Sequence, residues 1–344
     1  MNEALWAKAV QAKLLRTGRV RADTTVVAAN VAFPTDARLL ARAVGKLVRA
    51  ARRVQAAGGA TGTVMTDSRR AAIRRARQMA ATMRARAQLG REEVSAAAGR
   101  MTGDLAGLAE KAAAQAAAVL RNGRRAVARS LTGQMRGRLR RALGELAGTI
   151  GRTAVVVAQA RSRLAGQMPG GATRLVSLHD PDARPIRKGR IDKPIEFGYK
   201  AQVLDNDDGI ILDYAVECGA VPDGPQLLPA ITRVTRRTGR VPRTVTADRG
   251  YGQAAVERDL HAAGVRTVAI PCQATTSAAR KAVEHGRGFR KLVKWRTGCE
   301  GRISYLKRGY GWDRTRLDGR QGAAIWCGHG VLTHNLVKIA ALAS

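Results

Sequence analysis

The sequence predicts an α/β protein, built from a mixed sheet with flanking helices and a large all-helical insertion after the first strand. Three observations predict it. A Val- and Thr-rich run lies at residues 18–33, and a proline-free stretch rich in Ala, Arg and Leu follows at 37–165. Beyond residue 195, short β-type runs alternate with helical patterns. Strands that alternate with helices are typical of a sheet covered by helices.

The first strand is expected at residues 20–27, within GRVRADTTVVAANVAF. β-branched residues favour a pleated, half-buried surface, and this run has no helix signal. Pro34 ends the extended segment, and Thr35 followed by Asp36 is a helix N-cap pattern. Asp23 is the single acid of this strand.

Residues 37–165 predict four or five helices. Apolar residues recur there every three or four positions, with arginines on the other face. The clearest run is Leu39, Leu40, Val44, Leu47, Val48 and Ala51. Breaks are expected at Gly58-Gly59, Gly62, Gly90, Gly103, Gly123 and Gly148. The segment is either an ordered helical subdomain or a solvated spacer, and its basic face is either a solvated surface or a DNA contact.

The elements after the polar connector at 166–195 complete the sheet. Two β-type runs in 196–217 flank the turn sequence at 206–209, which is a strong hairpin signal. A helix is then expected from Asp223 to Thr238, a strand at 243–248 ending on Asp248, a helix at 253–263 and a strand at 265–271. A basic loop at 273–290 precedes the helix that contains Glu300. This order of strands and helices predicts a ribonuclease-H-like fold, in which the first and fourth strands are neighbours.

The composition indicates an anionic partner. The formal net charge is +35 and the pI is about 11.6. So large a charge repels itself, and a domain pI above ~9 is typical of nucleic-acid binding. No apolar run of ~18 residues and no signal-peptide pattern is present. We therefore expect a cytoplasmic, nucleoid-associated protein without a membrane partner. The four cysteines form no CxxC pair and no zinc-finger spacing, which favours reduced thiols.

The segment WRTGCEGRISYLKR at 295–308 suggests phosphate chemistry. At about 100° per residue, Arg296, Glu300 and Lys307 project within a narrow arc of one helix face. One carboxylate between two cations suits a metal ion held beside a polyanion. Together with Asp23 and Asp248, Glu300 makes three acids, which suffice for a two-metal phosphoryl-transfer site. Mg²⁺ is the expected ion because it prefers hard oxygen ligands, and Mn²⁺ is a possible substitute.

The cations near these acids are expected to contact phosphates. Arg296 and Lys307 would lie on either side of the scissile bond. Further DNA-contacting candidates are Arg249, Arg302 and Arg308.

Three motifs resemble bacterial insertion-sequence transposases of the DDE type. RVRADTTVVAANVAFPTDARLL is similar to the first-Asp segment of that family, TADRGYG to the second-Asp segment, and RTGCEGRISYLKRGYGWDRTRLDGRQGAAIW to the Glu segment. The motifs occur in the family's order, RKGRIDKPIEFGYKAQV fits between them, and the resemblance covers about 13–50 and 175–340. It implies that Asp23, Asp248 and Glu300 are a metal-binding triad.

The sequence departs from the family at two places. Val293 stands where the Tyr-Arg-Glu-Lys signature has its tyrosine, whereas Arg296, Glu300 and Lys307 match the rest of that signature. Only 22 residues precede Asp23, where family members usually have a helical DNA-end-binding domain. We therefore expect a chain that lacks this domain.

The resemblance implies metal-dependent strand cleavage at transposon ends followed by strand transfer into target DNA. It also implies a homodimer or a larger synaptic complex on DNA. Residues 1–36 and 166–344 would form the catalytic domain, with 37–165 as the helical insertion. The alternatives are a catalytically inactive, truncated DNA-binding remnant and a ribonuclease-H-like nuclease.

Other acids and aromatics have structural explanations beside functional ones. His179, Asp180 and Asp182 are a rival metal cluster, but an Asp-Pro sequence is typical of a turn. The acids at 205–208 are expected in the hairpin turn. Aromatic residues that flank the Glu300 helix are expected to pack in the core more often than to stack on a base; these are Trp295, Tyr310 and Trp312.

Overall fold

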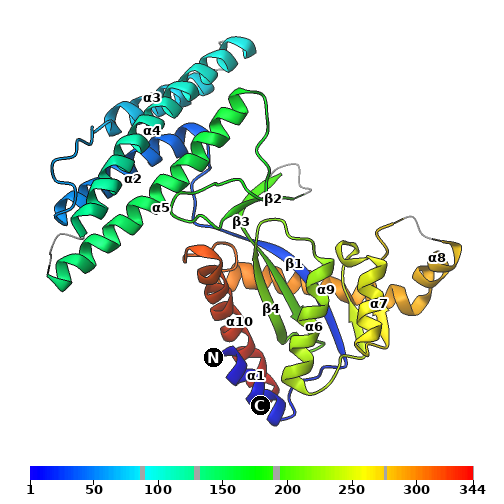
Figure 1. Ribbon diagram of the computed structural model, residues 1–344. Helices are drawn as coiled ribbons and strands as arrows, with labels where there is room; N and C mark the ends of the chain where they lie inside the picture. Colours follow the sequence, from blue (N-terminus) through cyan, green and yellow to red (C-terminus); the bar gives the residue numbers. More distant parts are fainter. Residues whose placement is uncertain (86–89, 128–131, 189–193, 275–276, 344) are drawn as a thin grey trace. The chain divides into compact units, whose positions relative to one another are not determined.

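A computed structural model describes residues 1–85, 90–127, 132–188, 194–274 and 277–343 (Figure 1). The chain forms two compact units. The sheet unit consists of residues 1–30 and 182–344, and the helical unit consists of residues 31–181.

The sheet unit is built on one mixed sheet with the strand order β2-β3-β1-β5-β6, and β4 also pairs with β3. Its strands are β1 (Arg19–Ala28), β2 (Arg184–Arg187), β3 (Ile195–Asp205), β4 (Ile211–Cys218), β5 (Thr244–Thr246) and β6 (Thr267–Ala269). β1 is antiparallel to β3 and parallel to β5, and β5 is parallel to β6. The predicted α/β fold of the ribonuclease-H-like class is confirmed, with the first and fourth predicted strands side by side at the centre.

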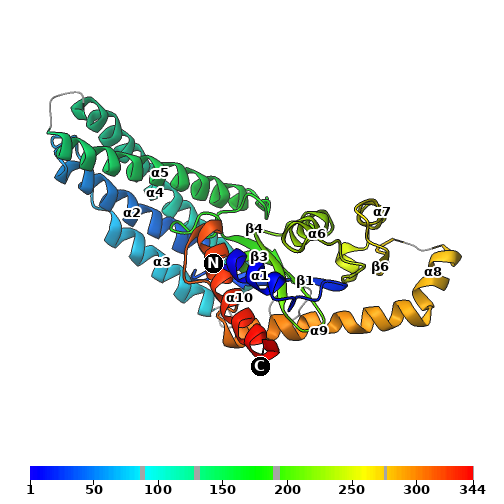
Figure 2. The same cartoon turned by 90° about the horizontal axis from the view of Figure 1, so that it is seen from below.

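Helices cover both faces of this sheet (Figures 1 and 2). On one face lie α6 (Gly224–Thr238) and α7 (Ala254–Ala262), and on the other lie α9 (Arg287–Gly309) and α10 (Gly319–Ala343). Successive residues of a strand point to opposite faces. Val20 and Ala22 therefore enter the apolar core beneath α6 and α7, whereas Arg21 and Asp23 face α9.

The predicted hairpin of β3 and β4 is confirmed. Its turn contains Gly209 at φ +74°, in the left-handed region that glycine enters without a Cβ clash. The Asn206 side chain accepts a hydrogen bond from the Ile210 N–H at 2.9 Å. From α10, Asn335 both accepts from the Ile211 N–H and donates to the Ile211 carbonyl. These contacts fix α10 on the edge strand.

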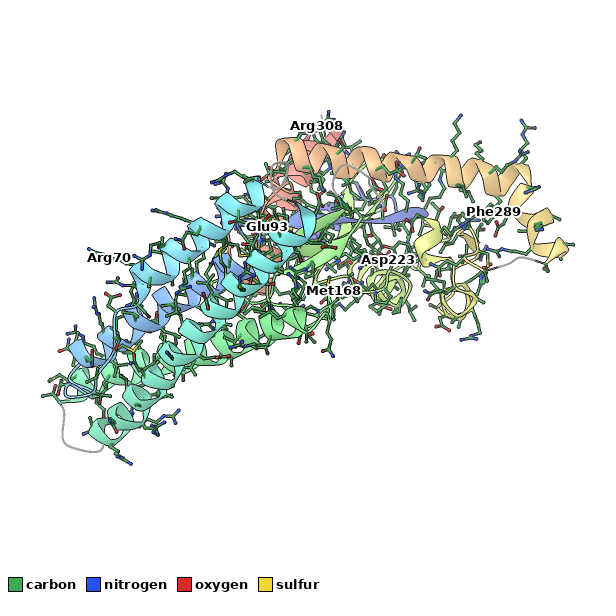
Figure 3. All side chains as sticks on the ribbon, turned by 90° about the horizontal axis from the view of Figure 1, so that it is seen from above. Arg70, Glu93, Met168, Asp223, Phe289 and Arg308 are labelled. Atoms are coloured by element: carbon green, nitrogen blue, oxygen red, sulfur yellow. The ribbon has the colours of Figure 1, made fainter. Side chains whose placement is uncertain are left out.

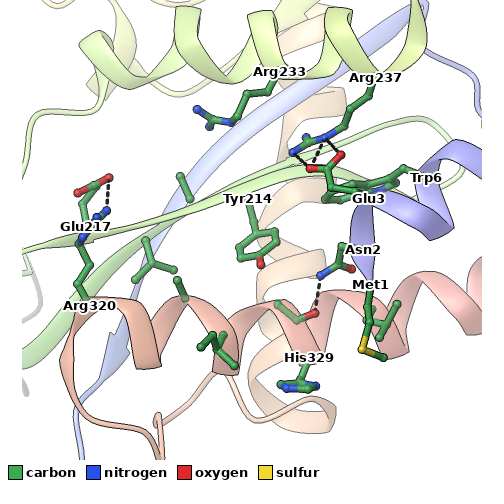
Figure 4. A pocket seen from close by; sticks show the side chains of 16 residues that line it. Met1, Asn2, Glu3, Trp6, Tyr214, Glu217, Arg233, Arg237, Arg320 and His329 are labelled. Atoms are coloured by element: carbon green, nitrogen blue, oxygen red, sulfur yellow. Dashed lines mark hydrogen bonds and ion pairs between the residues drawn. The ribbon is translucent and has the colours of Figure 1, made fainter.

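The N-terminal helix α1 (Asn2–Gln11) was not predicted and docks on the sheet unit through three side chains (Figure 4). Trp6 is buried, and its indole N–H donates to the Ile211 carbonyl at 2.8 Å. Glu3 pairs with Arg237 of α6 at 2.6 Å, and the Asn2 amide donates to the Gly328 carbonyl of α10 at 2.8 Å. A hollow of about 500 Å³ lies between α1, β4, α6 and α10.

The helical unit contains α2 (Asp36–Ala56), α3 (Arg69–Arg84), α4 (Arg91–Val127) and α5 (Gly133–Leu164) within its described residues. Thr35 caps α2 as predicted, because its hydroxyl accepts from the Arg38 N–H. Small and apolar residues of α2, α4 and α5 form most of its core, and Ala72 of α3 joins them.

Three of the predicted glycine breaks in this unit are wrong. Gly103 and Gly123 lie inside α4, and Gly148 lies inside α5. A Cβ at Gly123 would lie 2.8 Å from Leu143 and 3.0 Å from Val54. The absence of a side chain at Gly123 thus allows α4 to approach α2 and α5 closely. The local cost of a helical glycine, about 1 kcal/mol, is outweighed by packing.

The predicted basic loop at 273–290 is also wrong. The structure has α8 (Ala278–His285) there, and α9 already begins at Arg287. Ser277 caps α8 by accepting from the Arg280 N–H, and Arg280 pairs with Glu284 one turn later. Residues 275–276 of that prediction and 189–193 of the quoted motif lie outside the described residues. No described helix is long and apolar enough to span a bilayer.

Candidate active site

The sheet brings Asp23 and Asp248 together. Arg21 of β1 is paired with Thr246 of β5 in parallel register, and each acid follows two residues later on its own chain segment. Asp248 stands just before a single 3₁₀ turn (Arg249–Tyr251) and accepts from the Gly250 N–H at 2.8 Å. Asp23 accepts from the Thr24 N–H at 2.7 Å. Both carboxylates thus lie just beyond the paired stretch of β1 and β5, on the side of the carboxyl end of β5, where ligands bind in open α/β sheets.

Burial makes both acids hard to ionise. It raises the pKa of Asp23 from 3.8 to about 6, and the charges of Asp248 and Glu300 add to this while Arg296 opposes it. The pKa of Asp248 is raised as well, first by burial and then by the charge of Asp223. A cation between the two acids would remove this cost, because opposite charge favours the ionised form.

Arg296 joins Asp23 to Glu300. Its guanidinium donates from Nη1 to the Asp23 Oδ2 at 3.2 Å and from Nη2 to the Glu300 Oε1 at 2.7 Å. The Arg296 side chain is 13% exposed, whereas that of Glu300 is 59% exposed. The predicted helix face of Arg296 and Glu300 is therefore present, and its cation lies inside the acidic cluster.

The structure distributes the other predicted cations along α9 and the turn after β5. Arg249 and Arg308 are exposed, and Lys307 is half-buried (Figure 3 shows Arg308 on α9). Arg302 is 15% exposed and donates to the fully buried Asp205 at 3.3 Å. Arg302 thus contacts the sheet beneath α9.

Asp205 is at the centre of a buried hydrogen-bond network. The prediction that it belongs to a hairpin turn did not include this role. Besides Arg302, it accepts from Arg21 Nε at 2.6 Å and from Arg21 Nη2 at 3.0 Å. Arg21 also donates to the Trp295 carbonyl at 2.8 Å and lies 4.7 Å from the centre of the Trp295 ring. This network ties β1, β3 and α9 together directly beside Asp23.

Asp223 and Lys200 are a second polar pair at the site, which sequence reasoning did not include. A Cβ on Gly250 would lie 2.8 Å from the Asp248 Oδ1 and 3.0 Å from the Asp223 Oδ2. Lys200 pairs with Asp223 at 2.6 Å and also donates to the Val221 carbonyl at 2.9 Å. The only signal at Asp223 was its place before a helix, which is an ordinary N-cap position.

The donor set at this site fits a hard divalent cation, because it consists of carboxylate oxygens whose burial opposes ionisation. Over the part of the chain that the structure describes, however, no group of three or more His, Cys, Asp or Glu side chains is arranged to hold a metal ion. Arg296 stands between Asp23 and Glu300. Asp23 and Asp248 are neighbours across β1 and β5, and Glu300 is linked to Asp23 through this arginine.

The rival residues have structural contacts. The His179 Nδ1 is 2.9 Å from the Ser177 hydroxyl, and Asp182 accepts from the Arg320 N–H at 3.0 Å. Trp312 is fully buried, and its indole N–H donates to the Cys327 carbonyl at 3.1 Å. The expectation that Trp312 packs in the core is confirmed.

Comparison with protein-family models matches residues 177–336 to the family described as Transposase DDE domain. The matched segment includes Asp248 and Glu300, and Asp23 precedes it. This segment, a little under half of the chain, is thus similar to the DDE domain of transposases. The match supports a function of the transposase or nuclease type. Comparisons with curated proteins and with solved structures gave no match.

Proposed function

We propose that this protein is a DNA transposase that cleaves strands at transposon ends and joins the released 3′-OH to target DNA. The observation that supports this most is the position of Asp23, within β1, beside Asp248, just beyond the parallel partner strand β5, with Glu300 linked to Asp23 by Arg296. Both reactions are in-line displacements at phosphorus, so one site can perform them in turn.

Asp23, Asp248 and Glu300 would hold Mg²⁺, with Mn²⁺ as a substitute. The bound ions would neutralise charge on the phosphate and stabilise the attacking and leaving oxygens. Asp23 and Asp248 would then be ionised at neutral pH despite their raised pKa values. Glu300 would exchange its contact with Arg296 for the cation, which is feasible for a side chain that is 59% exposed.

Arg296, once released from Glu300, would be directed at the phosphate next to the scissile bond. Arg249, Lys307 and Arg308 would contact the DNA backbone farther away. Arg302 would act through α9, because its guanidinium is bound to buried Asp205. We also propose that residues 37–165 are an insertion in a catalytic domain formed by 1–36 and 166–344. A dimer or larger complex would hold two transposon ends together.

Strand cleavage and strand transfer with Mg²⁺ or Mn²⁺ test this proposal. The substrate is duplex DNA containing the ends of the element that encodes this chain. Asp248→Ala should reduce both activities by at least about a hundredfold, since loss of even an outer-shell partner of a metal ligand costs 10–100-fold. Asp207→Ala is the matched control, because Asp207 pairs with Arg19 away from the cluster.

Three results would contradict the proposal. Equal activity of wild type and Asp248→Ala would remove Asp248 from the site. Tight, salt-sensitive DNA binding without metal-dependent cleavage would indicate an inactive DNA-binding remnant. Preferential cleavage of RNA–DNA hybrids would indicate a ribonuclease-H-like nuclease.

A further inference from the structure

A groove between α2 and α3 of the helical unit combines an apolar floor with a rim of arginines. Its volume is about 700 Å³. The floor includes Ala37, Ala41, Ile73, Met79 and Met83. The arginines of the rim are Arg38, Arg42, Arg77 and Arg84. The lining contains no carboxylate, so the groove is a concentrated positive site.

Most carboxylates of this unit form ion pairs with other arginines. The ion pairs join Arg52 and Arg69 to Asp67, Arg75 to Asp104, Arg161 to Glu110, Arg53 to Glu145 and Arg163 to Asp36. Glu92 and Glu93 lie at the start of α4, outside the lining. Among the described residues, the four rim arginines have no ion-pair partner. All four are exposed.

The arginines of α3 form a regular row. Arg70 and Arg74 line a second hollow beside Arg77 (Figure 3 labels Arg70). Spacings of i, i+4, i+7 and i+14 place Arg70, Arg74, Arg77 and Arg84 on one helix face. The row from Arg70 to Arg84 is about 21 Å long at 1.5 Å per residue. A DNA strand presents about six phosphates over that length.

We propose that this groove binds the phosphate backbone of duplex DNA, at a surface separate from the acidic cluster of the sheet unit. The inference rests on the proposed function, which supplies the anionic partner. The guanidinium fork matches phosphate oxygens in two-point contacts. The apolar floor supports the aliphatic stems of the arginines while their charged ends reach outward. A repeating row of charge fits a polymer with a regular charge spacing better than it fits a single anionic group.

The test is binding of a fluorescent DNA duplex by the full chain, measured by anisotropy in EDTA over a series of salt concentrations. The groove variant replaces Arg38, Arg42, Arg77 and Arg84 with Gln. The control replaces Arg121, Arg124, Arg138 and Arg141 with Gln. These control residues are exposed arginines of α4 and α5, so both variants lose the same charge.

The groove variant should bind about 10²–10³-fold more weakly near physiological salt. Its plot of log K against log salt should lose about 1 from its slope for each phosphate contact removed. The control should change much less. Glutamine is a good helix former, so both variants should unfold at the wild-type temperature when followed by circular dichroism.

Equal losses in the two variants would overturn the proposal, because bulk charge would then explain the binding. Unchanged DNA binding in the groove variant with lost binding to phosphatidylserine vesicles would overturn it in favour of a membrane. Because the assay contains no divalent ion, its result is independent of the acidic cluster. A parallel cleavage assay of wild type with Mn²⁺ shows separately whether the transposase proposal fails.

Discussion

The two units of this protein are both rich in arginine, but they place it differently. The sheet unit pairs arginines with fully buried carboxylates: Arg21 and Arg302 with Asp205, and Arg237 and the partly exposed Arg233 with Asp213. The helical unit keeps most of its arginines at the surface around a core of Ala, Leu and Val. Its ion pairs are mostly half-exposed, as between Arg161 and Glu110.

This difference teaches how one composition supports two kinds of structure. A buried charge must be paired and hydrogen-bonded, so each such pair ties particular residues of distant segments together. Surface arginines have no such requirement, and they remain free to meet an external anion. We therefore expect substitution of the buried charges of the sheet unit to change stability, and substitution of the surface arginines of the helical unit to change ligand binding.

The largest effect should come from Asp205→Ala. This change leaves Arg21 and Arg302 without their buried partner, and breaking a buried pair costs about 3–5 kcal/mol. Urea unfolding measures the free energy. Asp207→Ala, which removes a carboxylate that is 22% exposed, should cost at most about 1 kcal/mol. A similar small loss in both variants would show that the buried pairs do not stabilise the sheet unit more than its exposed pairs do.

The next effect should come from Asp23→Asn in metal-free buffer. Folding raises the pKa of Asp23 from 3.8 to about 6, so its ionisation destabilises the wild type as pH rises through that window. The penalty is absent below pH 3.8 and complete above pH 6. The variant should therefore be more stable at pH 8 by at most about 3 kcal/mol, and the two proteins should converge near pH 4.

A pH series of unfolding curves measures this effect, and Asp67→Asn of the helical unit is its control. Arg69 lowers the pKa of the exposed Asp67 carboxyl. Its contribution to stability is present above the ordinary carboxyl pKa and is lost on acidification. The control should therefore change in the opposite direction with pH. An advantage of Asp23→Asn that does not depend on pH would refute the assigned cause.

A smaller effect should come from Gly123→Ala in the helical unit. The new Cβ would meet Leu143 at 2.8 Å and Val54 at 3.0 Å, and such overpacking typically costs about 1–3 kcal/mol. Gly137→Ala on α5 has no neighbour within 4 Å, and it should gain about 0.5–1 kcal/mol from better helix propensity. Thermal unfolding compares the two. The same sign for both would show that close packing does not define this core.

The smallest effect is expected for Arg161→Ala. Arg161 and Glu110 are 48% and 45% exposed, and such surface pairs contribute about 0–1 kcal/mol. Urea unfolding should barely distinguish this variant from wild type. A loss as large as that of Asp205→Ala would show that the helical unit also depends on its ion pairs.

The sequence by itself determined the class of fold and the three segments that contain the acids. Val- and Thr-rich alternation, the hairpin turn and the strand before Asp248 are local signals, because side-chain periodicity follows from backbone geometry within one element. The motifs of the DDE family were also local, and the family comparison supports the two of them that lie wholly within residues 177–336.

Only the tertiary structure decided which of these side chains meet. It set Arg296 between Asp23 and Glu300, buried Asp205 between two arginines and brought Asp223 beside Asp248. Packing also keeps the helix continuous through Gly123, where local propensity indicated a break. Contacts between segments far apart in the chain depend on register and packing, which no local pattern contains. The sequence therefore indicated which acids to consider, but it did not indicate which side chains contact them.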